Sequence, residues 1–185
     1  MKIAIGITGA TGAIYGIRLI EAIKSLSDAE VHLIVSSCGM KTIQIETQLP
    51  HEQIEKLADC IYPNDDLGAL LASGSYRLDA MIIIPCSMKT LSAISNGLSD
   101  TLIARCADVC IKEGRKLVLC PRETPLSAIH LENMLKLSRL GVGMIPPMPA
   151  FYNNPDSLED IINHHTMKVL DYIGIDNKWS SRWRG

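Results

Sequence analysis

The sequence lacks the features of several large classes of protein. Its net charge is only -2, from 18 Lys and Arg against 20 Asp and Glu, so no strongly basic surface is available for nucleic acid or for an anionic membrane. No apolar run approaches the roughly 18–20 residues of a membrane-spanning helix, and no basic-then-apolar signal peptide precedes the first strand-like run. We therefore expect a cytoplasmic protein that binds neither nucleic acid nor membrane.

The sequence also lacks the usual metal and redox motifs. None of its six cysteines forms a Cys-x-x-Cys pair, and most lie in apolar segments. A free cysteine in such a segment is typically a small buried hydrophobic residue of a reducing compartment. His130, His164 and His165 do not form a metal set, and neutral histidines at the surface or in the core are expected instead. We expect no bound metal.

Apolar β-type runs alternate with longer helical stretches along the 185 residues. The runs are nearly continuous in Ile, Val, Leu and Met, as in parallel strands covered on both faces. This alternation predicts an α/β fold, a three-layer doubly wound parallel sheet of the flavodoxin or Rossmann kind, with right-handed crossovers. The expected strands are 2–7, 31–36, 80–85, 117–120 and 142–145, and the expected helices are 13–26, 39–49, 88–95, 99–113, 126–140 and 158–173.

The length suits a single domain spanning residues 1–185. Residues 59–78 are less regular, with a turn at 63–66. Residues 174–185 form a polar tail with two tryptophans, for which we expect contact with a neighbouring subunit.

The first expected strand runs into a glycine-rich loop with Gly9, Gly12 and Gly16. Glycines let the backbone approach a phosphate or a ring, and the next helix offers unpaired N–H groups and a positive dipole end. NAD is disfavoured because the second strand ends in Ser36 and Ser37, without an acidic residue for the ribose. No Tyr-x-x-x-Lys pair exists either. Hydroxyl groups at this position suit a flavin.

Ser87 and Thr90 follow the third expected strand with the spacing of a helix N-cap. This turn suits a phosphate, and a plain helix cap is the alternative. The loops at 8–12, 86–90 and 121–125 all follow parallel strands, so they should open on one edge of the sheet, where ligands bind in open α/β folds.

Arg122 and Glu123 stand between two prolines at the end of the fourth expected strand. Pro121 and Pro125 fix two φ angles and remove two backbone donors, so the charged pair is held in a stiff loop. Thr124 has the features of a helix N-cap, with Pro125 as the first helical residue. The sequence therefore predicts a rigid cation and a rigid acid at the ligand-binding edge.

Five other polar residues are candidates that their local sequence does not distinguish. Arg105 and Lys112 are seven residues apart, which places them on one face of a helix. Lys168 and Glu46 have the default interpretation of solvated helix residues. Tyr152 lies in a proline-rigid loop after the last strand, and such loops often contact ligands.

Four motifs together resemble the UbiX family of flavin prenyltransferases, whose older names include aromatic-acid decarboxylase. They are Thr-Gly-Ala-Thr-Gly, Pro-Cys-Ser-Met-Lys-Thr, Pro-Arg-Glu-Thr-Pro and the run His-Leu-Glu-Asn-Met-Leu-Lys-Leu that begins at His130. The resemblance covers essentially the whole chain. It implies a flavodoxin-like fold, assembly into a dodecamer, and reduced FMN as a substrate.

The resemblance also implies roles for particular residues. FMN would be held by Gly9, Ala10, Thr11, Ser36, Ser87, Met88, Lys89, Thr90 and Arg122. Dimethylallyl phosphate would be held, partly across subunits, by Lys112, Arg122, Tyr152 and Lys168. Glu123 matches an acid that assists phosphate departure and later proton transfers, while Glu46, Thr11 and Arg105 match further active-site positions. Trp183 resembles a residue that covers a neighbouring site.

Two positions depart from the family pattern. Family members often have Ser in place of Thr11, which keeps the hydroxyl. Some have an aromatic residue in place of Leu67, so the shape of the prenyl pocket is left open. The choice between prenyl monophosphate and diphosphate also stays open, as does the pathway served, quinone synthesis or phenolic-acid degradation.

The chemistry implied by the residues agrees with that resemblance. Breaking an allylic C–O bond leaves a phosphate, which arginine and lysine stabilise in the absence of a metal. The electron-rich face of reduced flavin suits an allyl cation. We expect alkylation at N5 and C6 of FMN, with the product passing to a UbiD-like decarboxylase. The alternatives are a flavin-dependent decarboxylase, of the aromatic-acid or the cysteine type, and a non-catalytic FMN carrier.

Overall fold

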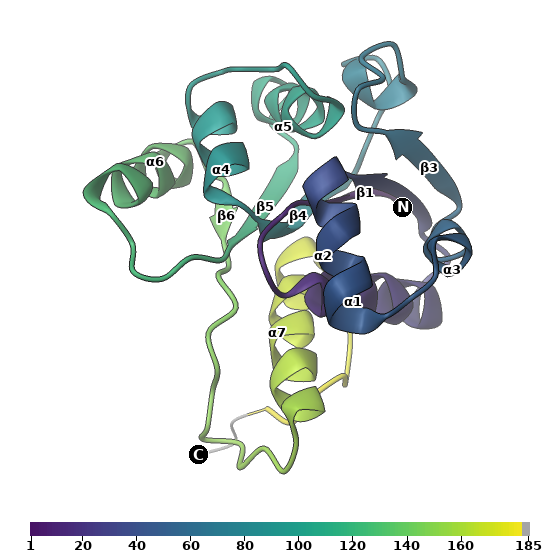
Figure 1. Cartoon of the computed structure of the whole chain (residues 1–185), viewed down its shortest axis with the longest axis vertical. Helices are drawn as coiled ribbons and strands as arrows, with labels where there is room; N and C mark the ends of the chain where they lie inside the picture. Colours follow the sequence, from purple (N-terminus) through teal and green to yellow (C-terminus); the bar gives the residue numbers. More distant parts are fainter. Residues whose placement is uncertain (183–185) are drawn as a thin grey trace.

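The computed structural model describes residues 1–182, apart from the side chains of His51 and Glu55. Its centre is a sheet of six parallel strands in the order β3-β2-β1-β4-β5-β6 (Figure 1). The fold is the predicted α/β, flavodoxin-like, doubly wound sheet. The strands are β1 (Lys2–Ile7), β2 (Glu30–Val35), β3 (Cys60–Pro63), β4 (Ala80–Cys86), β5 (Lys116–Pro121) and β6 (Gly143–Met144).

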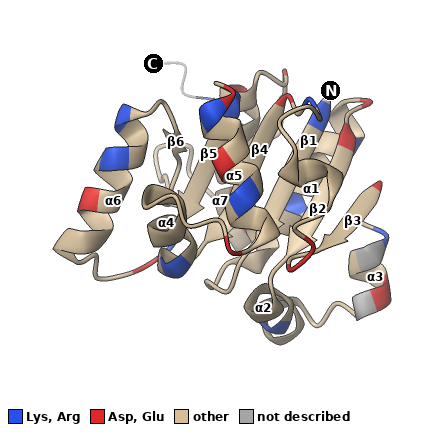
Figure 2. Ribbon diagram, turned by 90° about the horizontal axis from the view of Figure 1, so that it is seen from above, with Lys and Arg blue, Asp and Glu red and all other residues tan. Residues whose placement is uncertain are grey.

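Helices cover both faces of the sheet. On one face α1 and α7 pack together with α2, and on the other α4, α5 and α6 pack together. Figure 2 shows basic and acidic positions scattered over the helices of both layers. The helices are α1 (Ala13–Leu26), α2 (Ser37–Thr47), α3 (His51–Glu55), α4 (Met88–Ser95), α5 (Leu102–Lys112), α6 (Ala128–Arg139) and α7 (Leu158–Ile173), with a 3₁₀ turn η1 (Leu70–Ala72).

The two layers account for the continuous apolar strands. Successive side chains of a strand point to opposite faces, so Ile3 and Ile5 of β1 pack under α1 and α7, while Ala4 faces the other core with Met81 and Ile83 of β4. Because neither face is exposed to water, no alternation of polar and apolar residues is required. The cores position the carboxyl ends of the strands, where the candidate site lies.

β3 and α3 were not predicted. β3 has only four residues, is an edge strand, and alternates between partly buried and exposed side chains. It also ends in Pro63, a residue that argues against a strand assignment. The sequence therefore gives little hydrophobic signal here, and an irregular segment at 59–78 was expected instead.

Helix α6 begins later than predicted. Thr124 and Pro125 do not start it. The N-cap is Ser127, whose side chain accepts from the backbone of His130 while the His130 ring accepts from the Ser127 backbone. This reciprocal pair satisfies two helix-end donors. The stiff loop of Arg122 and Glu123 is consequently longer than expected and leads to an exposed turn.

The C-terminal segment folds back on its own chain. The indole Nε1 of Trp179 donates to Asn163 Oδ1 at 3.0 Å, and Arg182 binds Asp171 at 2.6 Å. This pairing lowers the pKa of Asp171. Trp183 lies outside the described residues. No helix within residues 1–182 combines the length and the apolar composition needed to cross a membrane.

The cysteines largely follow the prediction of buried hydrophobic residues. All six are free, and four are buried: Cys86, Cys106, Cys110 and Cys120. Burial raises the pKa of the Cys86 and Cys120 thiols, which keeps them protonated and unreactive. Cys60 is partly buried, and Cys38 is exposed at the mouth of the cleft described next.

Candidate active site

A cleft of about 750 Å³ opens at the carboxyl edge of the sheet. The loops after β1, β2, β3 and β4 line it, together with the start of α5. The strand order reverses between β1 and β4, and ligands of open α/β sheets bind at such a switch point. Five predicted site residues line this cleft, namely Gly9, Ser36, Ser87, Lys89 and Thr90.

Thr8 joins the two central loops of the cleft. Its buried hydroxyl donates to the carbonyl of Pro85 at 2.8 Å and accepts from the Ser87 N–H at 2.8 Å. At Gly9 the chain passes so close to α2 that an added Cβ would collide with Cys38. The glycine is therefore required for the packing of this loop as well as for access to a ligand.

Three helices point their N-termini into the cleft, each with a hydroxyl side chain as its cap. Ser36 begins α2 and accepts from Gly39 N at 3.0 Å, while Ser87 begins α4 and accepts from Thr90 N at 3.4 Å. Thr101 begins α5 in the same way. Helix N-termini have positive partial charge and free N–H groups. The cleft is therefore suited to an anionic ligand such as a phosphate.

The N-terminus of α1 does not provide such an anion site. Glu46 of α2 accepts hydrogen bonds from Gly12 N and Ala13 N, both at 2.9 Å. The expectation that the glycine loop leads to unpaired N–H groups was therefore wrong, since a carboxylate of the same chain already binds them. Gly12 caps the helix with φ of 99°, a backbone conformation that favours glycine.

This contact leads to a prediction for Glu46. Glu46→Ala is expected to lower the free energy of unfolding by about 1–2 kcal/mol, the usual cost of losing a helix cap, when measured by urea denaturation. Glu46→Gln keeps an oxygen acceptor and should cost less. The control is Gln44→Ala, at another exposed position of the same helix. Equal stability of Glu46→Ala and this control would contradict the capping role.

The cleft contains residues that the sequence did not indicate. The backbone carbonyl of Asn64 accepts from Leu102 N at 2.7 Å, and its side chain accepts from Ile103 N at 3.1 Å. Asn64 thus fixes the start of α5 beside Thr101. Asp65 and Asp100 complete this wall. The sequence did not predict β3, and it is the carboxyl end of β3 that places residue 64 at the carboxyl edge of the sheet. These lining residues were therefore missed.

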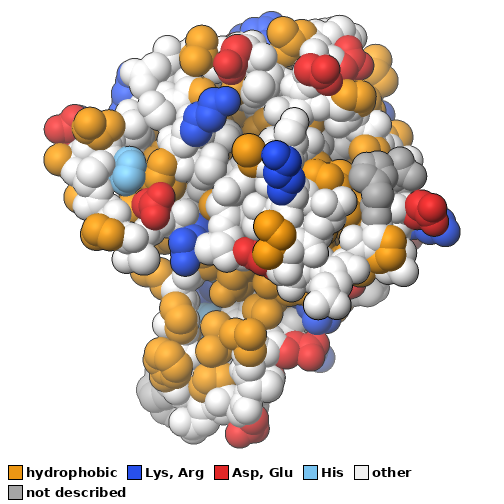
Figure 3. All heavy atoms as spheres, in the orientation of Figure 1, with side chains coloured by type: hydrophobic (Ala, Val, Ile, Leu, Met, Phe, Trp, Pro, Cys, Tyr) orange, Lys and Arg blue, Asp and Glu red, His pale blue; other side chains and the backbone are white. Residues whose placement is uncertain are grey.

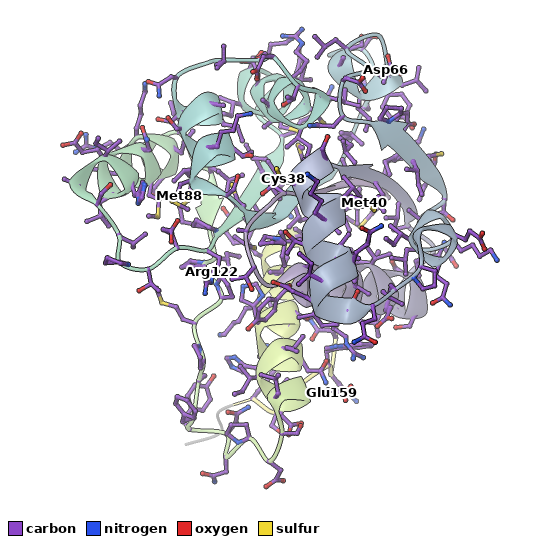
Figure 4. The ribbon with its side chains drawn as sticks, in the orientation of Figure 1. Cys38, Met40, Asp66, Met88, Arg122 and Glu159 are labelled. Atoms are coloured by element: carbon purple, nitrogen blue, oxygen red, sulfur yellow. The ribbon has the colours of Figure 1, made fainter. Side chains whose placement is uncertain are left out.

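Arg122 and Glu123 lie beyond the end of β5. The Arg122 backbone donates to Cys86 O at 3.2 Å, and the Glu123 carboxylate accepts from Thr124 N at 3.0 Å. Both side chains are exposed, and neither lines the cleft. Figure 4 shows the elements around this edge: α2 with Cys38, the start of α4 with Met88, and the loop with Arg122. Ala10, Thr11 and Met88 lie beside lining residues without lining the cleft themselves.

Arg105 and Lys112 lie on one face of α5, as their spacing predicted, but not in the cleft. Arg105 donates to Ala72 O at 3.2 Å and pairs with Asp108 at 2.8 Å. Lys112 pairs with Glu113 next to Gly74 and lowers the pKa of that carboxyl. Because α5 runs from the carboxyl edge to the amino edge of the sheet, Lys112 lies at the opposite edge from the cleft.

Tyr152 and Lys168 form a separate group. Residues 145–157 extend away from the sheet as an arm that returns into α7 (Figure 1). Tyr152 on this arm shares a 2.8 Å hydrogen bond with His164 of α7. Lys168 is one helical turn further on. Burial, and after it the charge of Lys168, lowers the pKa of His164. Leu67 is exposed in the loop after β3.

One group of potential metal ligands occurs within the part of the chain that the structure describes. Glu30, His32 and Cys60 lie together where β2 and β3 begin, at the edge opposite the cleft. The two His32 ring nitrogens already bond to the hydroxyls of Tyr62 at 3.1 Å and Tyr76 at 3.0 Å. We interpret the group as a polar network that satisfies a buried histidine.

Comparisons with known proteins point to one family. A model of the family described as Flavoprotein matches residues 1–169. The flavin prenyltransferase LpdB of Lactiplantibacillus plantarum is 52% identical over 184 residues, covering 100% of this chain and 98% of LpdB. The crystal structure of a dodecameric FMN-dependent UbiX-like decarboxylase from Escherichia coli O157:H7 is 51% identical, with a TM-score of 0.98 over 100% of both chains. AnUbiX (PadA1), solved in complex with FMN and dimethylallyl pyrophosphate, is 46% identical, with a TM-score of 0.97 over 100% of this chain and 97% of that one.

Proposed function

This chain belongs to the UbiX-like flavin prenyltransferase family of flavoproteins, and we propose that it transfers a dimethylallyl group from dimethylallyl phosphate to N5 and C6 of reduced FMN. The observation that carries the proposal is the cleft with three helix N-termini at the switch point of the sheet. Its volume is within the range of small-molecule sites, roughly 300–1,000 Å³.

FMN has one phosphate, and we assign it to the start of α4. There the hydroxyls of Ser87 and Thr90 lie 3.1 Å apart beside the first N–H groups of the helix. The N-terminus of α1 is excluded because Glu46 binds it. Ser36 and the loop of Gly9, Ala10 and Thr11 are then left for the ribityl chain and the ring. Met88, Lys89 and Arg122 complete this proposed flavin site.

The prenyl phosphate requires cations, and this chain provides them in separate places. Arg122 follows β5 at the carboxyl edge, Lys112 ends α5 at the amino edge, and Lys168 lies on α7. We propose that neighbouring copies bring Lys112, Arg122, Tyr152 and Lys168 together. A dodecameric relative that is 51% identical supports such an assembly, in which residues 174–185 would also contact a neighbour.

The reaction requires leaving-group stabilisation and proton transfer from this chain's residues. Reduced FMN supplies the electron-rich ring that accepts the allyl group. Arginine binds phosphate oxygens in a bidentate way and lysine as a point charge. Glu123, beside Arg122, would donate a proton to the departing phosphate and take part in later proton transfers. Three further residues, Arg105, Glu46 and Thr11, would hold neighbouring parts of the site in place.

We place the activity in the cytoplasm, because all six cysteines are free and a reducing compartment keeps them so. The product has a modified flavin ring and leaves the enzyme as a cofactor for another protein. A UbiD-like decarboxylase is the recipient that the family implies.

The experiment is a mass measurement of the flavin. The purified protein is mixed anaerobically with reduced FMN and dimethylallyl phosphate, and a flavin heavier by one prenyl unit is expected. Oxidised FMN is the negative control, and dimethylallyl diphosphate in a parallel reaction tests donor preference. An unchanged flavin mass in a folded, FMN-loaded sample would refute the proposed function. The alternative of a non-catalytic FMN carrier would then be favoured. Loss of CO₂ from an aromatic acid by the protein alone would favour a decarboxylase.

A further inference from the structure

We propose that the side-chain amide of Asn64 donates a hydrogen bond to a carbonyl oxygen of the flavin ring and so fixes the end of the cleft at which the ring lies. The inference rests on the proposed function, in which the cleft holds FMN with its phosphate at the start of α4. It goes beyond that function because neither motif spacing nor family resemblance gave Asn64 a role.

The hydrogen bonds of Asn64 determine which way round its amide lies. Oδ1 accepts from Ile103 N at 3.1 Å, and the backbone carbonyl accepts from Leu102 N at 2.7 Å. A backbone N–H bonds to the oxygen of an amide and not to its nitrogen, so Oδ1 and Nδ2 cannot be exchanged. Among the residues that the structure describes, Nδ2 has no partner, and it is not one of the buried atoms in that condition. Because Asn64 lines the cleft, its two N–H donors are accessible to a ligand there.

The charges along the cleft orient a ligand that has a phosphate at one end. Lys89, in the first turn of α4, is the one cation among the described lining residues, whereas Asp65 and Asp100 belong to the wall of Asn64. Figure 3 shows the face that carries α2 and α4, on which basic side chains stand apart from one another. Like charges repel, so the phosphate is favoured beside Lys89 and disfavoured beside the two carboxylates. The ring end of FMN is then left for the wall of Asn64.

The strand order gives the same direction for the ligand. The start of α4 follows β4 and Asn64 follows β3, with β1 and β2 between these strands. Neighbouring strands are about 4.8 Å apart, so about 14 Å separates the ends of β4 and β3. A ligand that extends from α4 toward Asn64 therefore crosses the loops after β1 and β2, which contain Gly9 and Ser36.

The chemistry of the ring identifies the part that Asn64 contacts. The pyrimidine part of a flavin has two carbonyl oxygens, whereas the opposite edge of the ring has two methyl groups. An N–H donor can therefore bind the pyrimidine part and not the methyl edge. Holding the ring by this part restricts its rotation in the cleft, which fixes where N5 and C6 meet the prenyl donor.

Asn64→Asp separates the flavin contact from the support of α5. Aspartate has nearly the same shape and can still accept from Ile103 N, and a negative charge beside a helix N-terminus is favourable, so the free energy of unfolding should not fall. The N–H donor, however, is replaced by a carboxylate. Fluorescence titrations of the full protein should show affinity for both FMN and riboflavin lowered about tenfold or more. Asn154→Asp, at an exposed position outside the cleft, is the matched control for the added charge.

The wild-type protein provides a second measurement that does not depend on the folding of a variant. FMN analogues with sulfur in place of the oxygen at C2 or at C4 have a weaker hydrogen-bond acceptor at that position. One of the two analogues should bind about threefold to tenfold more weakly than FMN, the usual effect of weakening one hydrogen bond. In Asn64→Asp this difference between FMN and the analogue should disappear.

The proposal has three outcomes that would overturn it. They are unchanged flavin affinity in folded Asn64→Asp, a loss for FMN without a loss for riboflavin, and equal affinity of the wild-type protein for FMN and both analogues. The second outcome would place Asn64 near the phosphate instead of the ring. Failure of the proposed function is distinguishable, because it would appear as an absence of prenylated flavin with the wild-type protein, whereas these titrations measure flavin binding alone.

Discussion

Ser87→Asp is expected to abolish FMN binding while leaving helix α4 intact. Aspartate is as good an N-cap as serine, so its carboxylate can accept from Thr90 N where the hydroxyl does now. The same carboxylate puts a negative charge where we assign the FMN phosphate. Like charges placed together cost several kcal/mol, so FMN affinity should fall by about 100-fold or more.

The measurement is a fluorescence titration with FMN and, in parallel, with riboflavin, which has no phosphate. The loss of affinity should be much smaller for riboflavin. Ser127→Asp is the matched control, because Ser127 caps α6 with the same geometry outside the cleft. If Ser36→Asp weakens FMN binding more than Ser87→Asp does, the phosphate lies at α2 and our assignment is wrong.

The parts of this site that could be predicted from sequence are local ones. Ser87 and Thr90 form a cap within four residues, and apolar runs on either side fix the ends of β4 and α4. A parallel sheet then places consecutive loops at one edge without further information. The edge of the sheet at which the cleft lies, and its walls after β1, β2 and β4, were therefore predictable from spacing and from strand direction.

The parts that could not be predicted depend on contacts between distant segments. Glu46 reaches the start of α1 from 33 residues away, and nothing in its own helix marks it as a cap. Asn64 depends on β3, whose four residues have almost no hydrophobic pattern. The sequence offers two possible N-caps for α6, Thr124 and Ser127. The structure uses Ser127, which forms a reciprocal pair of hydrogen bonds with His130.

A second group of residues is unpredictable for another reason. Lys112 is at the C-terminal end of α5, far from the part of that helix that lines the cleft, and Lys168 is on α7, which does not line it. Neither hydrophobic periodicity nor motif spacing carries information about which surfaces of different copies meet. Their assignment comes from family resemblance, and in our proposal they come together only when copies of the chain assemble.

Glu123→Gln is expected to lower turnover by about 10²–10⁴-fold, the usual contribution of a general acid, with FMN affinity unchanged. Glutamine keeps the size and an oxygen that can accept from Thr124 N, as Glu123 does at 3.0 Å. It has no acidic proton to give. The stiff loop of Arg122 should therefore keep its structure while the proposed proton donor is removed. Glu132→Gln, on the exposed surface of α6, is the control for loss of one negative charge.

The leaving group provides the sharper test of this role. A proton from Glu123 matters most when the departing group is a strong base, so the deficit of Glu123→Gln should shrink with a donor whose leaving group needs no proton. Single-turnover rates of flavin prenylation, measured with one donor of each kind, give this comparison directly. Equal deficits with both would show that Glu123 contributes charge or position and not a proton. Normal turnover of Glu123→Gln would remove it from the reaction, and the acid would have to come from another residue at the same edge of the sheet.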